Sequence, residues 1–141
     1  MQTLGPFAVA LAMLAATAFA QTTDFTSFEA VPGKAIEIGN YAAVGNACAA
    51  GAPPTIRVVE PPRSGTLSVR AGERLYRIPG CPPVKMQAEV LTYEARDTAT
   101  GTDHVVYDIV GANGQVSTKD VTIHLQDPPR AAPAPKPDIK L

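Results

Sequence analysis

The feature that most constrains the fold of this chain is a pair of short apolar segments, each carrying a tyrosine. Residues 91–95 and 105–110 both favour a strand, because branched and aromatic side chains pack well on a pleated surface. The polar loop between them ends in Gly101-Thr102-Asp103, which leads directly into the second segment. This layout predicts a hairpin in a secreted β-sandwich domain.

The rest of the chain after residue 20 also reads as short strands separated by turns, with no apolar helical stripe. About seven strands at regular spacing are typical of a sandwich, so the fold class is predicted to be all-β. We expect strands near 35–38, 55–59, 66–70, 74–78, 87–95, 104–110 and 121–125. Alternation at period two predicts an inner face made by Leu91, Tyr93, Val105, Tyr107, Ile109, Val121, Ile123 and Leu125.

Both ends of the chain depart from the strand pattern. Residues 7–16 are apolar and Ala18-Phe19-Ala20 is a small-x-small cleavage signal, so 1–20 reads as a signal peptide. The apolar run is too short for a membrane span, so we expect no transmembrane segment in the mature chain and a periplasmic or secreted location. Residues 127–141 are Pro-rich and are predicted to be a disordered tail, which leaves 21–126 as one domain.

The chain has two cysteines, Cys48 and Cys81. Behind a signal peptide, in an oxidising compartment, two cysteines are most simply read as one disulfide. A redox or metal pair is less favoured, because the spacing is not Cys-x-x-Cys. On the chain-entropy estimate a cross-link over a loop of this length stabilises the fold by about 3–4 kcal/mol.

No motif for catalysis, metal binding or nucleic-acid binding accompanies these strands. A formal net charge of −1 argues against a nucleic-acid binder. The serines lack a nucleophile elbow, and His104 follows Asp103 directly, so the two side chains point to opposite faces of a strand. Asp97, Asp103 and Asp108 lack calcium-loop spacing, and for Asp103 we expect hydrogen bonds to turn amides. We therefore expect no enzyme activity, no metal and no cofactor.

One charged feature is a candidate site for an anion or a partner. It consists of Arg63, Arg70, Arg74 and Arg77. If Ala71-Gly72 closes a tight turn between the strands at 66–70 and 74–78, two of these arginines lie near its tip. Arginine binds phosphate and carboxylate groups well. The alternative is that the charges keep an edge strand soluble and block sheet-to-sheet aggregation.

Several segments together resemble a known family. Residues 61–67 (PPRSGTL), 90–93, Gly101-Thr102-Asp103, Tyr107 and the terminal Val-Thr-Ile-x-Leu strand resemble a bacterial Ig-like or cadherin-like repeat, over about 30–126. The resemblance implies an immunoglobulin-like β-sandwich, with adhesion or scaffolding as a common use of the fold. Fold alone does not assign a function.

Two functional hypotheses follow. The first is a non-catalytic secreted or periplasmic binding or scaffold module of the bacterial cell envelope, whose partner is an envelope protein or an anionic envelope polymer. The second is a small periplasmic inhibitor or chaperone-like regulator of an enzyme or envelope protein. The sequence does not decide between them.

Overall fold

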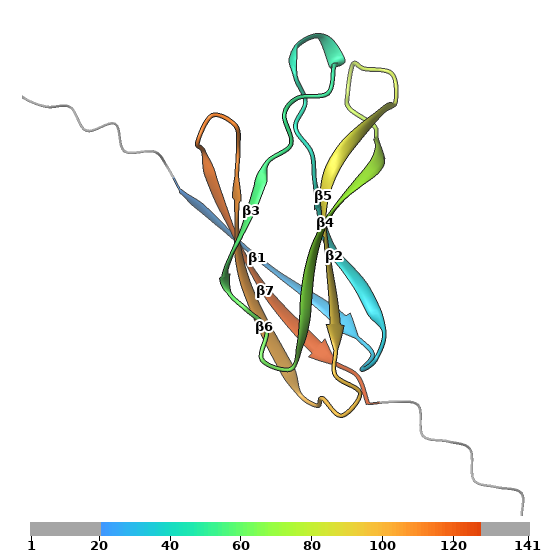
Figure 1. Ribbon diagram of the computed structural model, residues 1–141, viewed down its shortest axis with the longest axis vertical. Coiled ribbons are helices and arrows are strands. Elements are labelled where there is room, and N and C mark those ends of the chain that lie inside the picture. The colour runs from blue at the N-terminus through green and yellow to red at the C-terminus, as the bar shows by residue number, and fades with distance from the viewer. Residues whose placement is uncertain (1–20, 128–141) are drawn as a thin grey trace, which may run out of the picture.

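The computed structural model describes residues 21–127, so the predicted signal peptide and all but the first residue of the predicted tail lie outside the described residues. The described part has seven strands and one single-turn 3-10 helix, η1, and no helix in it is long and apolar enough to cross a membrane (Figure 1). The elements are β1 (Thr22–Ala30), β2 (Ala35–Tyr41), η1 (Asn46–Cys48), β3 (Thr55–Glu60), β4 (Gly65–Tyr76), β5 (Val84–Ala95), β6 (Thr102–Val110) and β7 (Val116–Leu125).

The strands form two sheets, in the orders β1-β7-β6-β3 and β2-β5-β4. All pairs are antiparallel except β1 with β7, which is parallel. The predicted all-β class is confirmed, and the strand order is that of an immunoglobulin-like sandwich whose first strand has joined the sheet of the last strand. Loops 42–54, 77–83 and 111–115 therefore lie at one end, called here the upper end (Figure 1).

The expected hairpin between 91–95 and 105–110 is wrong. Segment 91–95 belongs to β5 in the three-stranded sheet, whereas 105–110 belongs to β6 in the four-stranded sheet. Leu91 and Tyr93 are fully buried, as is Val105, because the two segments face each other across the core and do not pair edge to edge. The loop at 96–101 crosses from one sheet to the other.

The expected turn at Ala71-Gly72 is also wrong. The chain continues through both residues as the single strand β4, which is twelve residues long. It pairs with β5 without a break, and Gly72 lies opposite Ala88. A Cβ at Gly72 would come within 3.3 Å of a Val90 methyl group, so glycine here serves a close approach between strands and does not form a turn.

The first strand, β1, was missed. Its first six residues, 22–27, are all exposed, and Phe25 keeps 76% of its surface accessible. Only Phe28 and Ala30 reach the core. The strand is held mainly by its backbone pairing to β7. Because it buries few side chains, its sequence has no alternation of apolar and polar residues.

The predicted inner faces are confirmed. Leu91, Tyr93, Val105, Tyr107, Val121 and Ile123 are the largest fully buried side chains, and Ile109 and Leu125 pack against them. The predicted disulfide between Cys48 and Cys81 is confirmed as well, with a Cα–Cα distance of 5.7 Å. It joins loop 42–54 to loop 77–83 at the upper end, where neither loop is held by a sheet.

Truncation of Ile123 tests the assignment of the inner face. Ile123 is 0% exposed, so Ile123→Ala is expected to lower the free energy of unfolding by about 2–5 kcal/mol, through lost burial and a new cavity. Urea unfolding of the mature chain measures this. As a control, Leu75→Ala at a position that is 57% exposed should change the free energy by less than about 0.5 kcal/mol. Similar losses in both variants would show that the inner face is misassigned.

Candidate functional site

The four arginines of the candidate site do not converge. Arg63 lies in the crossover between β3 and β4, Arg70 and Arg74 lie on β4, and Arg77 directly follows that strand. At about 3.3 Å per residue, the first and last of them are roughly 45 Å apart along the chain. The arginines are spread along β4 and the segments on either side of it and do not meet at a tip, so no focused positive field forms.

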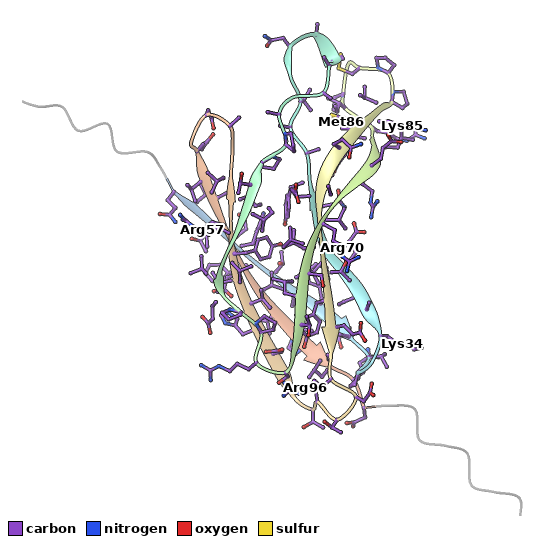
Figure 2. The ribbon with its side chains drawn as sticks, viewed as in Figure 1. Lys34, Arg57, Arg70, Lys85, Met86 and Arg96 are labelled. Atoms are coloured by element: carbon purple, nitrogen blue, oxygen red, sulfur yellow. A yellow bond between two sulfur atoms is a disulfide. The ribbon has the colours of Figure 1, made fainter. Side chains whose placement is uncertain are left out.

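Arg74 is engaged in a local network. Its Nη2 donates to Glu37 Oε2 at 2.8 Å and its Nη1 donates to the Glu73 carbonyl at 3.1 Å. The bond from Arg74, with a second from Asn40, lowers the pKa of Glu37. Arg70 instead is exposed on the outer face of its sheet, opposite Val90, and Figure 2 shows it on the β4 ribbon. Arg70 is therefore the arginine of β4 that is free to meet a partner.

The strand that carries these arginines is an edge strand. β4 pairs with β5 on one side only, and its other side has no strand in the described part of the chain. The edge strands β2 and β3 each contain a register shift, at Glu37/Gly39 and Val58/Glu60, which interrupts a docking edge. The edge strand β1 is continuous but is only nine residues long. β4 has no such shift and no proline, so its unpaired N–H and C=O groups form a long continuous row.

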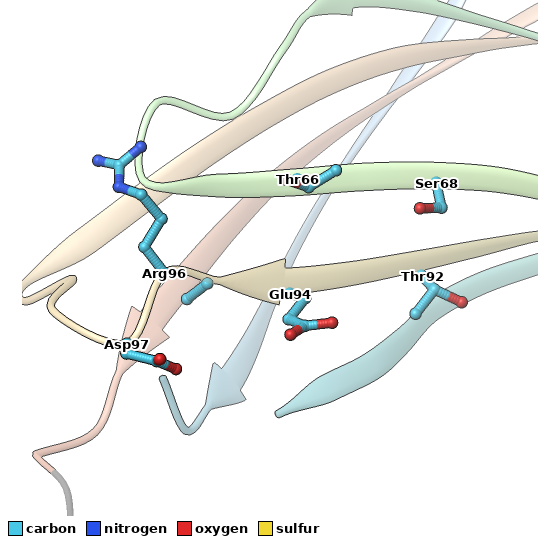
Figure 3. Close-up of a pocket in the computed structure, with 7 residues that line it drawn as sticks. Thr66, Ser68, Thr92, Glu94, Arg96 and Asp97 are labelled. Atoms are coloured by element: carbon cyan, nitrogen blue, oxygen red, sulfur yellow. The ribbon is translucent and has the colours of Figure 1, made fainter. Parts of the chain in front are cut away.

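A polar groove of about 510 Å³ borders this edge (Figure 3). Thr66 and Ser68 contribute to it from β4, and their cross-strand partners Glu94 and Thr92 contribute from β5. Arg96 and Asp97, which follow β5, line the groove beyond Glu94. The sequence analysis missed this groove, because alternate polar residues on two strands become one surface only when the register between them is known.

Asp103 anchors the start of β4. This carboxylate is only 3% exposed, and it accepts hydrogen bonds from the backbone N–H groups of Arg63 (2.9 Å) and Ser64 (3.0 Å). It also accepts from the Tyr93 hydroxyl at 2.8 Å and from the N–H of His104 at 2.9 Å. Burial acts to raise the pKa of Asp103, but these four bonds outweigh it and the pKa is lowered. Asp103 does bind backbone amides, as expected. Two of these amides, however, lie in the distant loop between β3 and β4 and not in the local turn.

His104 points to the opposite face from Asp103, so the two do not form a catalytic dyad. Its Nε2 lies 2.6 Å from Asp120 Oδ1 on β7, and its Nδ1 lies 3.4 Å from Glu60 Oε1 on β3. The hydrogen bond to Asp120, together with that to Glu60, raises the pKa of His104 although partial burial opposes this. The imidazole thus lies between acidic groups of β3 and β7 and, when protonated, links three neighbouring strands on the outer face of their sheet.

Asp108 makes a second link on that face. Arg57 Nη2 donates to Asp108 Oδ2 at 2.5 Å, and the Thr118 hydroxyl donates to Asp108 Oδ1 at 2.7 Å. The bond from Arg57, followed by that from Thr118, lowers the pKa of Asp108. The contacts of His104 and Asp108 each join neighbouring strands, so stabilisation of the sheet is enough to explain both. Within residues 21–127 no group of three or more His, Cys, Asp or Glu side chains could hold a metal ion.

Comparison of the chain with known protein families, with curated proteins and with solved structures gave no match. A functional conclusion therefore depends on geometry. Within residues 21–127 four strands lie at sheet edges, and the edge of β4 is the longest of them and the one that borders the polar groove and Arg70.

The link through His104 predicts a dependence of stability on pH. Because the pKa of His104 is raised on folding, its contribution is fully present below the unfolded value of about 6.5 and is lost as the pH rises through the folded value. His104→Gln should therefore destabilise the domain more at pH ~5.5 than at pH ~8.5, by about 0.2–1 kcal/mol, the range of solvent-exposed ion pairs. Urea unfolding at both values measures this difference.

The control for that prediction is His124→Gln. His124 is exposed on β7 and has no hydrogen bond or ion pair among residues 21–127. Its replacement should give the same small effect at both pH values. If the free energies of unfolding of the two variants depend on pH in the same way, the carboxylates of Asp120 and Glu60 do not stabilise the protonated form of His104.

Proposed function

We propose that this chain is a non-catalytic secreted or periplasmic binding module of the cell envelope, and that its partner adds a strand to the free edge of β4. The observation that carries the proposal is the edge itself: twelve residues without a bulge or a proline, paired on one side only within residues 21–127. Addition of a strand satisfies such an edge through main-chain hydrogen bonds, and side chains then select the partner. The resemblance to Ig-like and cadherin-like repeats supports the same reading.

The side chains along the edge define the partner's chemistry. One face of β4 exposes apolar surface at Val69 (38%) and Leu75 (57%). The other face carries the hydroxyls of Thr66 and Ser68 and then the guanidinium of Arg70. Because successive side chains of a strand alternate between faces, the matching partner is an extended segment that alternates apolar residues with acidic or polar residues.

The arginine row favours an acidic partner segment over a basic one. Arg70, Arg74 and Arg77 lie on or directly after β4, against Glu73 of that strand and Glu37 of β2, which is paired with Arg74. Attraction between such exposed charges is screened over about 8 Å at physiological salt. Binding is therefore expected to be fast and to weaken as the salt concentration rises.

An inhibitor or chaperone-like regulator would use the same surface as a scaffold module. The two hypotheses differ only in the identity of the partner. A regulator would cap an exposed strand of one enzyme or envelope protein and would be recovered with it in equal amounts. A scaffold module would be recovered with cell-wall or outer-membrane material. Crosslinking of the mature chain in isolated envelopes separates these two cases.

The binding test uses the mature chain and isolated envelope fractions at low salt. Arg70→Ser combined with Arg74→Ser should reduce binding by more than about fivefold, because two cations beside the edge are lost. Val69→Lys should reduce it independently, because a lysine on an edge strand opposes strand addition. Sedimentation of labelled protein with the fractions measures bound and free chain.

Lys34→Ser is the matched control, since Lys34 is an exposed cation in the turn before β2, outside the edge. It should bind within about twofold of the unchanged chain, as exposed charge changes rarely disturb a fold. Urea unfolding confirms that each variant is folded. If the edge variants bind as well as Lys34→Ser, the arginines only keep the edge soluble and the proposal is wrong.

A further inference from the structure

The upper end of the sandwich is free of charged side chains over long stretches. No Asp, Glu, Lys or Arg occurs in 38–56, in 78–84 or in 109–118. These stretches contain loop 42–54, most of loop 77–83 and the turn 111–115, which the topology brings to one end (Figure 1). The loops of the opposite end contain Lys34, Arg63, Arg96 and Asp97. The two ends therefore suit different ligands.

A cavity of about 250 Å³ lies at this uncharged end, between the two sheets. One part of its lining is apolar, with Ala42, Ala43, Pro54, Ile109 and Val116. The other part has the polar residues Asn113, Gln115, Ser117, Thr22 and Tyr41. Asn113 Oδ1 already accepts from the Gln115 N–H, and the Thr22 hydroxyl donates to that of Ser117 at 3.4 Å. Cavities for drug-sized ligands run from about 300 Å³ upward, so this one suits a single ring with a short substituent.

Tyr41 connects the cavity to the core. Its hydroxyl lies 2.7 Å from that of Tyr107, and their ring centroids are 6.0 Å apart. Gly39 makes room for this pair, because a Cβ there would lie 2.7 Å from the Tyr41 hydroxyl and 3.0 Å from the Tyr107 hydroxyl. Among residues 21–127 neither hydroxyl has another hydrogen-bond partner.

Two hydroxyls carry two protons, and their mutual bond uses one of them. Tyr107 is 1% exposed, so its proton is best donated to Tyr41, since an unsatisfied donor in the core is costly. Burial and this donated bond together raise the pKa of Tyr107. The proton of Tyr41 then has no acceptor among residues 21–127, and Tyr41 is one of the residues that line the cavity.

We propose that this cavity binds an uncharged sugar that carries an acetamido group. The acetamido carbonyl accepts the proton of Tyr41, and its methyl group packs on the alanines and Ile109. The ring hydroxyls exchange hydrogen bonds with the carboxamides of Asn113 and Gln115 and with the hydroxyl of Ser117. An uncharged lining offers no partner for a charged group, so a sugar whose amine is free and protonated should bind more weakly. This site is independent of the β4 edge.

The test titrates the isotope-labelled mature chain with N-acetylglucosamine and follows the amide resonances. Saturable shifts at millimolar concentration are expected in 41–43 and 109–117, the segments around the cavity. Glucosamine and glucose, which lack the acetamido carbonyl and methyl group, should bind at least about tenfold more weakly. An absence of saturable shifts with N-acetylglucosamine, or equal shifts with glucose, overturns the proposal.

Two variants connect binding to the cavity. Tyr41→Phe removes the donated proton and should weaken binding by about tenfold, whereas Tyr76→Phe should not, because the Tyr76 hydroxyl donates to Asn40 outside the cavity. Ala43→Leu enlarges a side chain that lines the cavity and should abolish binding. It provides an independent test in case Tyr41→Phe fails to fold. Unchanged affinity in Ala43→Leu would show that the sugar binds elsewhere and would contradict the assignment.

Discussion

The hydrogen bonds of Asp103 are the constraint on which the rest of the structure depends. One buried carboxylate on β6 holds the Tyr93 hydroxyl of β5, in the opposite sheet, and the amides of Arg63 and Ser64 in the crossover. It therefore joins both sheets and the loop that passes between them. Loss of the carboxylate would leave the buried Tyr93 hydroxyl without a partner, at about 1–3 kcal/mol, and would release three partly buried N–H groups.

The position of the crossover determines which strand becomes the exposed edge. Because the amides of Arg63 and Ser64 are fixed, the chain leaves β3 and enters the other sheet directly at Gly65. A Cβ at Gly65 would collide with the backbone of β5, so the first residue of β4 has to approach its neighbour closely. β4 then follows β5 for its whole length, and its opposite side is left unpaired in the described chain. The proposed binding edge is thus a consequence of the buried carboxylate.

The sequence predicts the buried faces well and the connections between strands poorly. Period-two alternation identifies Tyr107, Val121 and Ile123 as core residues, because one buried face forces alternate side chains inward. The same alternation does not say which sheet a strand joins, so β5 and β6 were expected to form a hairpin. Ala71-Gly72 reads as a turn in isolation, yet twelve consecutive partners on β5 keep the strand extended there.

The candidate sites also divide into features that a local sequence pattern predicts and features that depend on how the strands are arranged. The disulfide followed from cysteine usage alone, because only one pairing exists. Arg70 and Arg74 lie on an edge strand, but the convergence of the four arginines depended on a turn that does not form. The polar groove and the tyrosine pair involve residues far apart in the sequence, such as Ser68 with Thr92 and Tyr41 with Tyr107. No local pattern marks such pairs before the register of the sheets is known.

Amide hydrogen exchange of the isolated mature chain tests most directly that a buried carboxylate fixes the crossover and leaves β4 with a free edge. The amides of Arg63 and Ser64 should be protected although they lie in a loop, because Asp103 accepts both. Along β4 protection should alternate, with every second amide bonded to β5 and the others exchanging rapidly into solvent. Rapid exchange at Arg63 and Ser64, or uniform protection from Thr66 to Leu75, would contradict this account.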